Sequence, residues 1–88
     1  MARNGDGELL NDQDLAALEA EMERLGQEKK QCEQMIQELR LKEDPGQGIF
    51  YAREIFDRQQ EKLRIQVEID LRRAKKNRYL LAREWGEL

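Results

Sequence analysis

Apolar residues recur along the first half of the chain at alternating intervals of three and four. They fill the a and d positions of four consecutive heptads, namely Leu15, Leu18, Met22, Leu25, Lys29, Cys32, Ile36 and Leu39. Only Lys29 is charged, and the positions between are mostly Glu, Gln, Arg and Lys. This pattern is typical of a coiled-coil helix with a polar outer face, in which a Lys at an a position can fix the register at some cost in stability. It predicts a helix over about residues 12–43.

The start of this helix is indicated by its capping residues. Asn11 is a good N-cap, and Asp14 occupies the third helical position of a capping-box-like pattern. Asp12 and Asp14 lie in the first turn, near the positive end of the helix dipole. Leu10 and Leu15 are spaced for a hydrophobic staple. Residues 1–9, with two glycines and no periodicity, are expected to form a flexible tail.

The second half of the chain carries two apolar stripes on opposite sides of one predicted helix, about residues 49–86. The first stripe contains Ile49, Ala52, Phe56, Leu63, Val67, Leu71, Ala74, Leu81, Trp85 and Leu88. The second stripe, on the reverse side, contains Tyr51, Ile55, Ile65, Ile69 and Leu80. A helix with two apolar faces needs two partners, and the chain offers one other long helix.

Residues 63–71 also fit a different element. They alternate apolar and polar positions perfectly and include Ile65, Val67 and Ile69, as a half-buried strand does. A strand needs a partner, however, and no second segment of the chain resembles one. Strong helix formers flank the stretch, and neither Gly nor Pro occurs between Ile49 and Trp85. We therefore favour a helix; the strand alternative would require pairing between chains.

Residues 44–48 interrupt both helical patterns and predict a turn. Pro45 disfavours helical geometry at Asp44, and Gly46 and Gly48 allow the chain to reverse. A break this short usually joins antiparallel helices. With its tip at residues 44–48, the hairpin brings the first stripe of the second helix against the heptads of the first. The expected neighbours are Ile36 and Phe56, Leu25 and Val67, Met22 and Leu71, and Leu18 and Ala74.

The predicted fold is therefore an all-α antiparallel helical hairpin of two long helices. Two-helix hairpins of this size rarely stand alone in water. We expect the chain to dimerise into a four-helix bundle or coiled coil, or to dock onto another protein, through the second stripe. The expected partner-binding residues are Tyr51, Ile55, Ile65, Ile69, Leu80 and Trp85.

The absence of three residue types bears on chemistry. The chain contains no His, Ser or Thr. It therefore lacks the commonest general base and transition-metal ligand, and it has no hydroxyl nucleophile. Di-iron bundles require a Glu-x-x-His pattern, and no Gly-rich phosphate loop or EF-hand spacing occurs. We expect no enzymatic activity, no metal and no cofactor.

Cellular location is inferred from what the chain contains. Cys32 is the only cysteine and sits at a d position, where it is expected to act as a small buried hydrophobe. No apolar run is long enough to span a membrane, and residues 1–7 lack the apolar stretch of a signal peptide. A cytoplasmic, reducing environment is expected.

Charge differs between the two halves of the chain. Residues 1–44 hold 12 acids and 6 bases, whereas residues 45–88 hold 7 acids and 10 bases. The bases concentrate in one cluster: Arg72, Arg73, Lys75, Lys76, Arg78 and Arg83. This basic cluster has two interpretations. It binds nucleic acid, with Tyr79 or Trp85 stacking on bases, or it pairs with Glu19, Glu21 and Glu23 of the first helix.

Two apolar ends pose a similar choice. Trp85, with Leu81 and Leu88, either packs on Leu9 and Leu10 or serves as an anchor for a partner. Phe50, at the hairpin tip, lies on neither stripe, which favours a contact with another chain. The sequence as a whole favours a non-enzymatic protein–protein interaction or oligomerisation module, such as an adaptor, assembly factor or small chaperone. The alternative is a nucleic-acid-associated dimer that uses the basic cluster.

Overall fold

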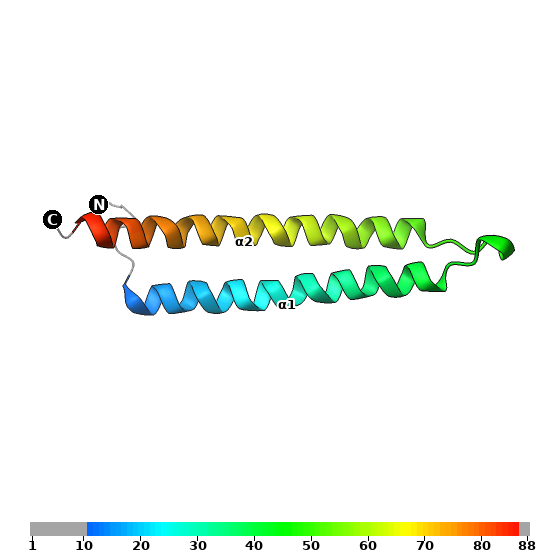
Figure 1. Cartoon of the computed structure of the whole chain (residues 1–88), viewed down its shortest axis with the longest axis horizontal. Coiled ribbons are helices and arrows are strands. Elements are labelled where there is room, and N and C mark those ends of the chain that lie inside the picture. The colour runs from blue at the N-terminus through cyan, green and yellow to red at the C-terminus, as the bar shows by residue number, and fades with distance from the viewer. Residues whose placement is uncertain (1–10, 87–88) are drawn as a thin grey trace.

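Two long helices lie side by side and run in opposite directions (Figure 1). The structure is a computed structural model that describes residues 11–86. Helix α1 spans Asp12–Lys42, a 3-10 turn η2 spans Pro45–Gln47, and helix α2 spans Ala52–Gly86. The predicted all-α helical hairpin is confirmed, and residues 63–71 are helical rather than a strand. The predicted tail, residues 1–9, lies outside the described residues.

Helix α1 begins with a complete capping box. The Asp14 backbone N–H donates to the Asn11 side chain over 2.8 Å, and the Asn11 backbone N–H donates to the Asp14 carboxylate over 3.1 Å. Two of the backbone donors that a helix start leaves without helical partners are thus satisfied. Arg40 and Lys42 in the last turn face the negative end of the helix dipole. The predicted cap is confirmed; Leu10 of the predicted staple is outside the described range.

The hairpin turn is held by a short antiparallel bridge. Asp44 and Ile49 exchange two backbone hydrogen bonds, each 2.9 Å long. Between them, Gly48 takes the left-handed conformation with a φ of 71°, which a glycine adopts without steric cost. The Glu43 carboxylate also accepts the Tyr51 backbone N–H over 3.0 Å. Because residues 48–51 make these contacts, α2 begins at Ala52 rather than near residue 49.

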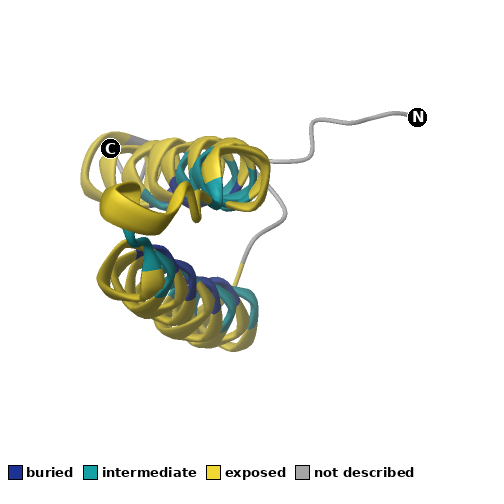
Figure 2. Ribbon diagram, turned by 90° about the vertical axis from the view of Figure 1, so that its right-hand side faces the viewer, coloured by how far each residue is buried: buried dark blue, intermediate teal, exposed yellow. Residues whose placement is uncertain are grey.

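The core lies between the helices and is narrow. Leu25 and Cys32 from α1 and Ile65 and Ile69 from α2 form its central cluster, with Met22 packed against it. Viewed nearly end-on, the buried residues occupy the sides of the two helices that face each other, and the outer sides are exposed (Figure 2). Leu18, Ile36 and Tyr79 are buried as well.

The face of α2 that meets α1 is the opposite of the predicted one. Ile65 and Ile69 are 4% and 7% exposed, whereas Val67 and Leu71 are 54% and 60% exposed. The expected contacts of Leu25 with Val67 and of Met22 with Leu71 are therefore wrong. So are the expected contacts of Ile36 with Phe56 and of Leu18 with Ala74. The offset along the helices is close to the prediction, because Glu21 contacts Arg72 and Lys29 contacts Gln66.

The reason for this reversal is a second heptad series in α2 that includes basic residues. It alternates intervals of four and three without interruption. We call it the inner seam: Tyr51, Ile55, Arg58, Lys62, Ile65, Ile69, Arg72, Lys76, Tyr79 and Arg83. Its regular spacing matches that of α1, so the two series stay in contact along the whole hairpin. Four of its cations reach acids of α1, whereas the first stripe contains no cation.

Candidate protein-docking surface

The most apolar face of the molecule points away from the hairpin core. Six large side chains on the side of α2 opposite α1 are each 54–66% exposed. We call them the outer stripe: Phe56, Leu63, Val67, Leu71, Leu81 and Trp85. Together with Ala74, and with Gln60 and Arg78 at two polar positions of the same series, they recur at an average of about 3.6 residues, so the stripe follows one side of a straight helix. Monomeric proteins rarely expose an apolar surface this continuous.

The outer side of α1 is different. Opposite its core positions it presents exposed polar or small residues such as Ala20, Glu23, Gln27 and Gln34. Among the described residues of α1, the exposed large hydrophobics are Met35 and Leu41, both in the half nearest the turn. The unpartnered apolar surface therefore belongs mainly to one helix.

The inner seam is held at its edges by ion pairs between the helices. Arg72 is central: its Nε donates to Glu21 over 2.7 Å, and its Nη1 donates to Glu68 of its own helix over 2.6 Å. These two hydrogen bonds raise the pKa of Arg72 above its ordinary value. Lys76 reaches Glu19 over 3.0 Å, and Lys62 reaches Glu33 over 3.2 Å.

Near the open end of the hairpin, the Asp12 carboxylate joins the two helices. Asp12 Oδ1 accepts the Tyr79 hydroxyl and Arg83 Nη1, each over 3.0 Å. Burial, followed by the hydrogen bond to Asp12, raises the pKa of the Tyr79 hydroxyl. Tyr79, which the sequence suggested as a base-stacking residue, is thus buried between the helices.

The residues of the basic cluster differ in the partners that they contact. Arg72, Lys76 and Arg83 pair with acids of α1, as one of the two interpretations expected. Glu19 and Glu21 are the predicted acceptors, whereas Glu23 accepts a hydrogen bond from Gln27 instead. Arg73 pairs with Asp70 within α2 over 3.2 Å. Of the remaining two residues, Arg78 is exposed and lies within the apolar spacing of the outer stripe, while Lys75 is half-buried.

The predicted partner-binding residues do not form one surface. Ile65 and Ile69 are buried against α1, and Tyr51 and Ile55 are half-buried on the same face, so their assignment to a free face is wrong. Leu80 lies at the edge and is 40% exposed, and Trp85 belongs to the outer stripe. Sequence reasoning missed the inner seam because half of its positions are polar. The unbroken spacing of four and three would have identified it.

Cys32 is buried in the central cluster and is 4% exposed, as predicted. Burial is the main cause that raises the pKa of its thiol, and the nearby Glu61 carboxylate raises it further. Both effects favour the neutral thiol over the thiolate, which is the nucleophilic form. Lys29, the charged a position, donates a 2.6 Å hydrogen bond to Gln66 across the interface.

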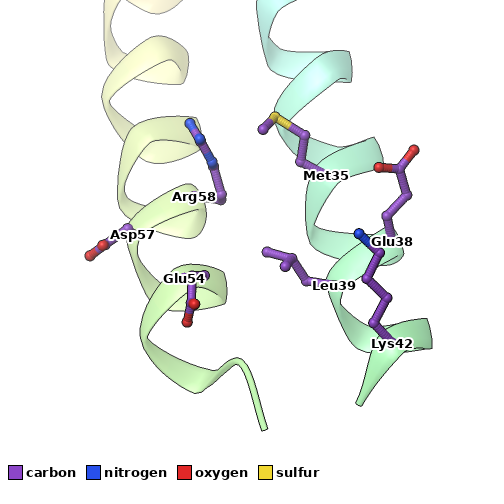
Figure 3. A pocket seen from close by; sticks show the side chains of 7 residues that line it. All are labelled: Met35, Glu38, Leu39, Lys42, Glu54, Asp57 and Arg58. Carbon is purple, nitrogen blue, oxygen red and sulfur yellow. The ribbon is translucent and has the colours of Figure 1, made fainter. Parts of the chain in front are cut away.

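A groove lies between the helices near the turn (Figure 3). Met35 and Leu39 extend toward α2 from one wall, and Arg58 runs along α2 on the other. Glu38, Lys42, Glu54 and Asp57 complete its charged rim. Met35, one of its lining residues, is itself exposed. Among the residues that the structure describes, no group of His, Cys, Asp or Glu side chains is arranged to hold a metal ion.

The chain matches no family model, no curated protein and no solved structure. No helix within the described range is long and apolar enough to cross a membrane. The outer stripe is the most unusual part of the surface over residues 11–86.

Proposed function

We propose that this protein is a non-enzymatic protein–protein interaction module that docks through the outer stripe of α2. The observation that carries the proposal is the row of large apolar side chains left exposed on the side of α2 opposite the core. Burying each of them in a partner would contribute on the order of 1 kcal/mol, because each is already about half covered. A helix face of this kind suits helix-on-helix recognition.

The shape of the hairpin supports the same use. Ion pairs and a regular seam join α2 to α1 on one side, so the outer stripe is presented on a straight helix rather than on a loop. Binding surfaces on such elements lose less entropy when they dock. The contacts of the basic cluster favour this proposal over nucleic-acid binding. Three of its six cations already pair with acids of α1 and are less available to phosphates.

The experiment is site-specific photo-crosslinking in the cells that make the protein. A photoreactive residue at Val67 in the outer stripe, or at Leu71, is expected to give a crosslinked protein adduct of defined mass. The matched control places the same residue at Gln27 or Gln34 on the outer side of α1, where no adduct is expected. Equal labelling at all four positions, or none at any of them, would overturn the proposal.

A further inference from the structure

We propose that the partner covering the outer stripe is a second copy of this chain, whose α2 runs antiparallel to the first. The inference rests on the proposed function and names its partner. In the resulting dimer the two α2 helices lie in the middle and the two α1 helices lie outside. The order across the assembly is α1, α2, α2 of the copy and α1 of the copy.

The position of the stripe on α2 determines this order. In a square four-helix bundle each helix buries two adjacent faces, roughly a quarter turn apart. Here the inner seam and the outer stripe are on opposite sides of α2: Ile69 is buried against α1, while Val67, two residues earlier, points away from it. A second copy docked on the outer stripe therefore extends the row of helices and does not close a square. The four-helix bundle expected from the sequence is replaced by a flat arrangement.

The amount of apolar surface is close to what a dimer requires. If each of the six side chains offers on the order of 100 Å² of apolar surface, the stripe contributes on the order of 600 Å² per copy. A specific interface buries roughly 800 Å² per partner, and the side chains beside the stripe provide the rest. The polar outer side of α1 offers no second surface of this kind, so pairing through α2 uses up the main apolar face. A closed two-fold dimer does this without forming fibres.

The distribution of side-chain sizes favours the antiparallel direction. The two aromatic members stand at opposite ends of the stripe, Phe56 near the turn and Trp85 near the open end, about 43 Å apart. Antiparallel pairing places Phe56 of each copy beside Trp85 of the other, where aromatic rings gain from offset packing.

The same register places the smaller residues in the middle. Val67 meets the small Ala74, which allows the helices to approach closely, and Leu71 lies next to its own copy at the two-fold axis. Arg78, which occupies a polar position in the spacing of the outer stripe, faces Leu63 of the copy. Its aliphatic stem covers Leu63 while its guanidinium reaches water at the rim.

Sedimentation of the purified full chain tests the stoichiometry between about 1 and 100 μM. A dimer is expected. The double variant Leu63→Glu/Leu71→Glu is expected to raise the dimer dissociation constant by roughly 100-fold or more, because it places carboxylates on a buried face. The matched control, Gln27→Glu/Gln34→Glu, adds the same charge to the outer side of α1 and is expected to leave the dimer intact. A wild-type chain that stays monomeric throughout would overturn the inference.

Disulfide trapping tests the direction, and it does so without relying on how the charged variants fold. Single cysteines are introduced in a Cys32→Val background. Leu71→Cys is expected to form a disulfide with its own copy on oxidation. Phe56→Cys is expected to crosslink only when mixed with Trp85→Cys. Crosslinking of Phe56→Cys with itself would indicate parallel pairing and overturn the proposed arrangement.

The two proposals fail in different ways. Adducts to another protein at Val67, together with a monomeric pure chain, would refute the self-pairing and leave the docking function standing. The absence of any adduct at Val67 or Leu71, together with a monomeric pure chain, would refute both.

Discussion

The two faces of α2 differ in a way that hydrophobicity alone does not anticipate. The inner seam is covered by α1, although seven of its ten positions are cations or tyrosines. The outer stripe is more apolar, yet each of its members is more than half exposed. The face with fewer apolar residues is thus the one that packs against α1 in the hairpin.

This difference shows what selects the intrachain face in a long hairpin. The inner seam has the same three-and-four spacing as α1, and its cations match the acids along the edges of α1. The outer stripe fits the period of a straight helix and contains no cation, so its own side chains would leave those acids unpaired. Regular spacing and charge matching distinguish the face that packs against α1, and the surplus apolar surface stays exposed.

The largest expected effect comes from shortening a side chain of the inner seam. Ile69→Ala should lower the free energy of unfolding by about 2–5 kcal/mol, because it leaves a cavity in the central cluster. Val67→Ala on the outer stripe is the control and should cost less than about 0.5 kcal/mol when association is suppressed by low protein concentration. Urea unfolding followed by circular dichroism measures both. Equal losses of unfolding free energy in the two variants would contradict the proposed difference between the two faces.

The ion pairs at the seam should matter next. Arg72→Met is expected to lower Tm by several degrees, since it leaves Glu21 and Glu68 without their shared donor. The control is Arg24→Met, because Arg24 and Glu28 are exposed and 3.8 Å apart. Tm should hardly change there. Added salt should reduce the Tm difference between the Arg72 variant and the wild type. A Tm difference that does not depend on salt concentration would argue against charge matching.

The turn also contributes to stability, because it determines how α2 enters the hairpin. Gly48→Ala should cost about 1 kcal/mol, since a left-handed backbone is strained for alanine. Gly46 provides the control: its φ is not positive, and an added Cβ would meet only the Asp44 carboxylate at 3.4 Å. Gly46→Ala should therefore be milder in the same urea measurement. Equal costs would remove the special role of Gly48.

The smallest effect is expected at Tyr79 and appears mainly at high pH. Its pKa in the folded chain is raised above the ordinary value of 10.0, so the neutral hydroxyl is the form that the fold favours. The stability it provides is complete below that ordinary value and is lost as pH rises through the folded-state value. Tyr79→Phe should unfold slightly more readily at pH 8 and should lack this alkaline loss. Parallel alkaline melting curves of the two proteins would contradict the prediction.

The sequence predicted the elements better than their faces. Asn11 and Asp14 identified the start of α1 because capping depends on adjacent residues, and Pro45 and Gly48 located the turn for the same reason. The rotation of α2 could not be read from apolar positions alone. Arg58, Lys62, Arg72 and Lys76 occupy seam positions through long aliphatic stems whose charged ends reach the edge. A pattern that counts such residues as polar assigns them to the outside.

The constant offset between the helices has a consequence for how the chain folds. Sequence separation grows steadily along the hairpin: Lys29 and Gln66 are 37 residues apart, Glu21 and Arg72 are 51 apart, and Asp12 and Arg83 are 71 apart. Each contact shortens the loop that the next one must close, so ordering from the turn outward avoids the largest entropy losses. We therefore expect contacts between the helices to form in order from the turn at Gly48 toward the open end. Among the described residues, the contacts of Asp12 should form last and open first.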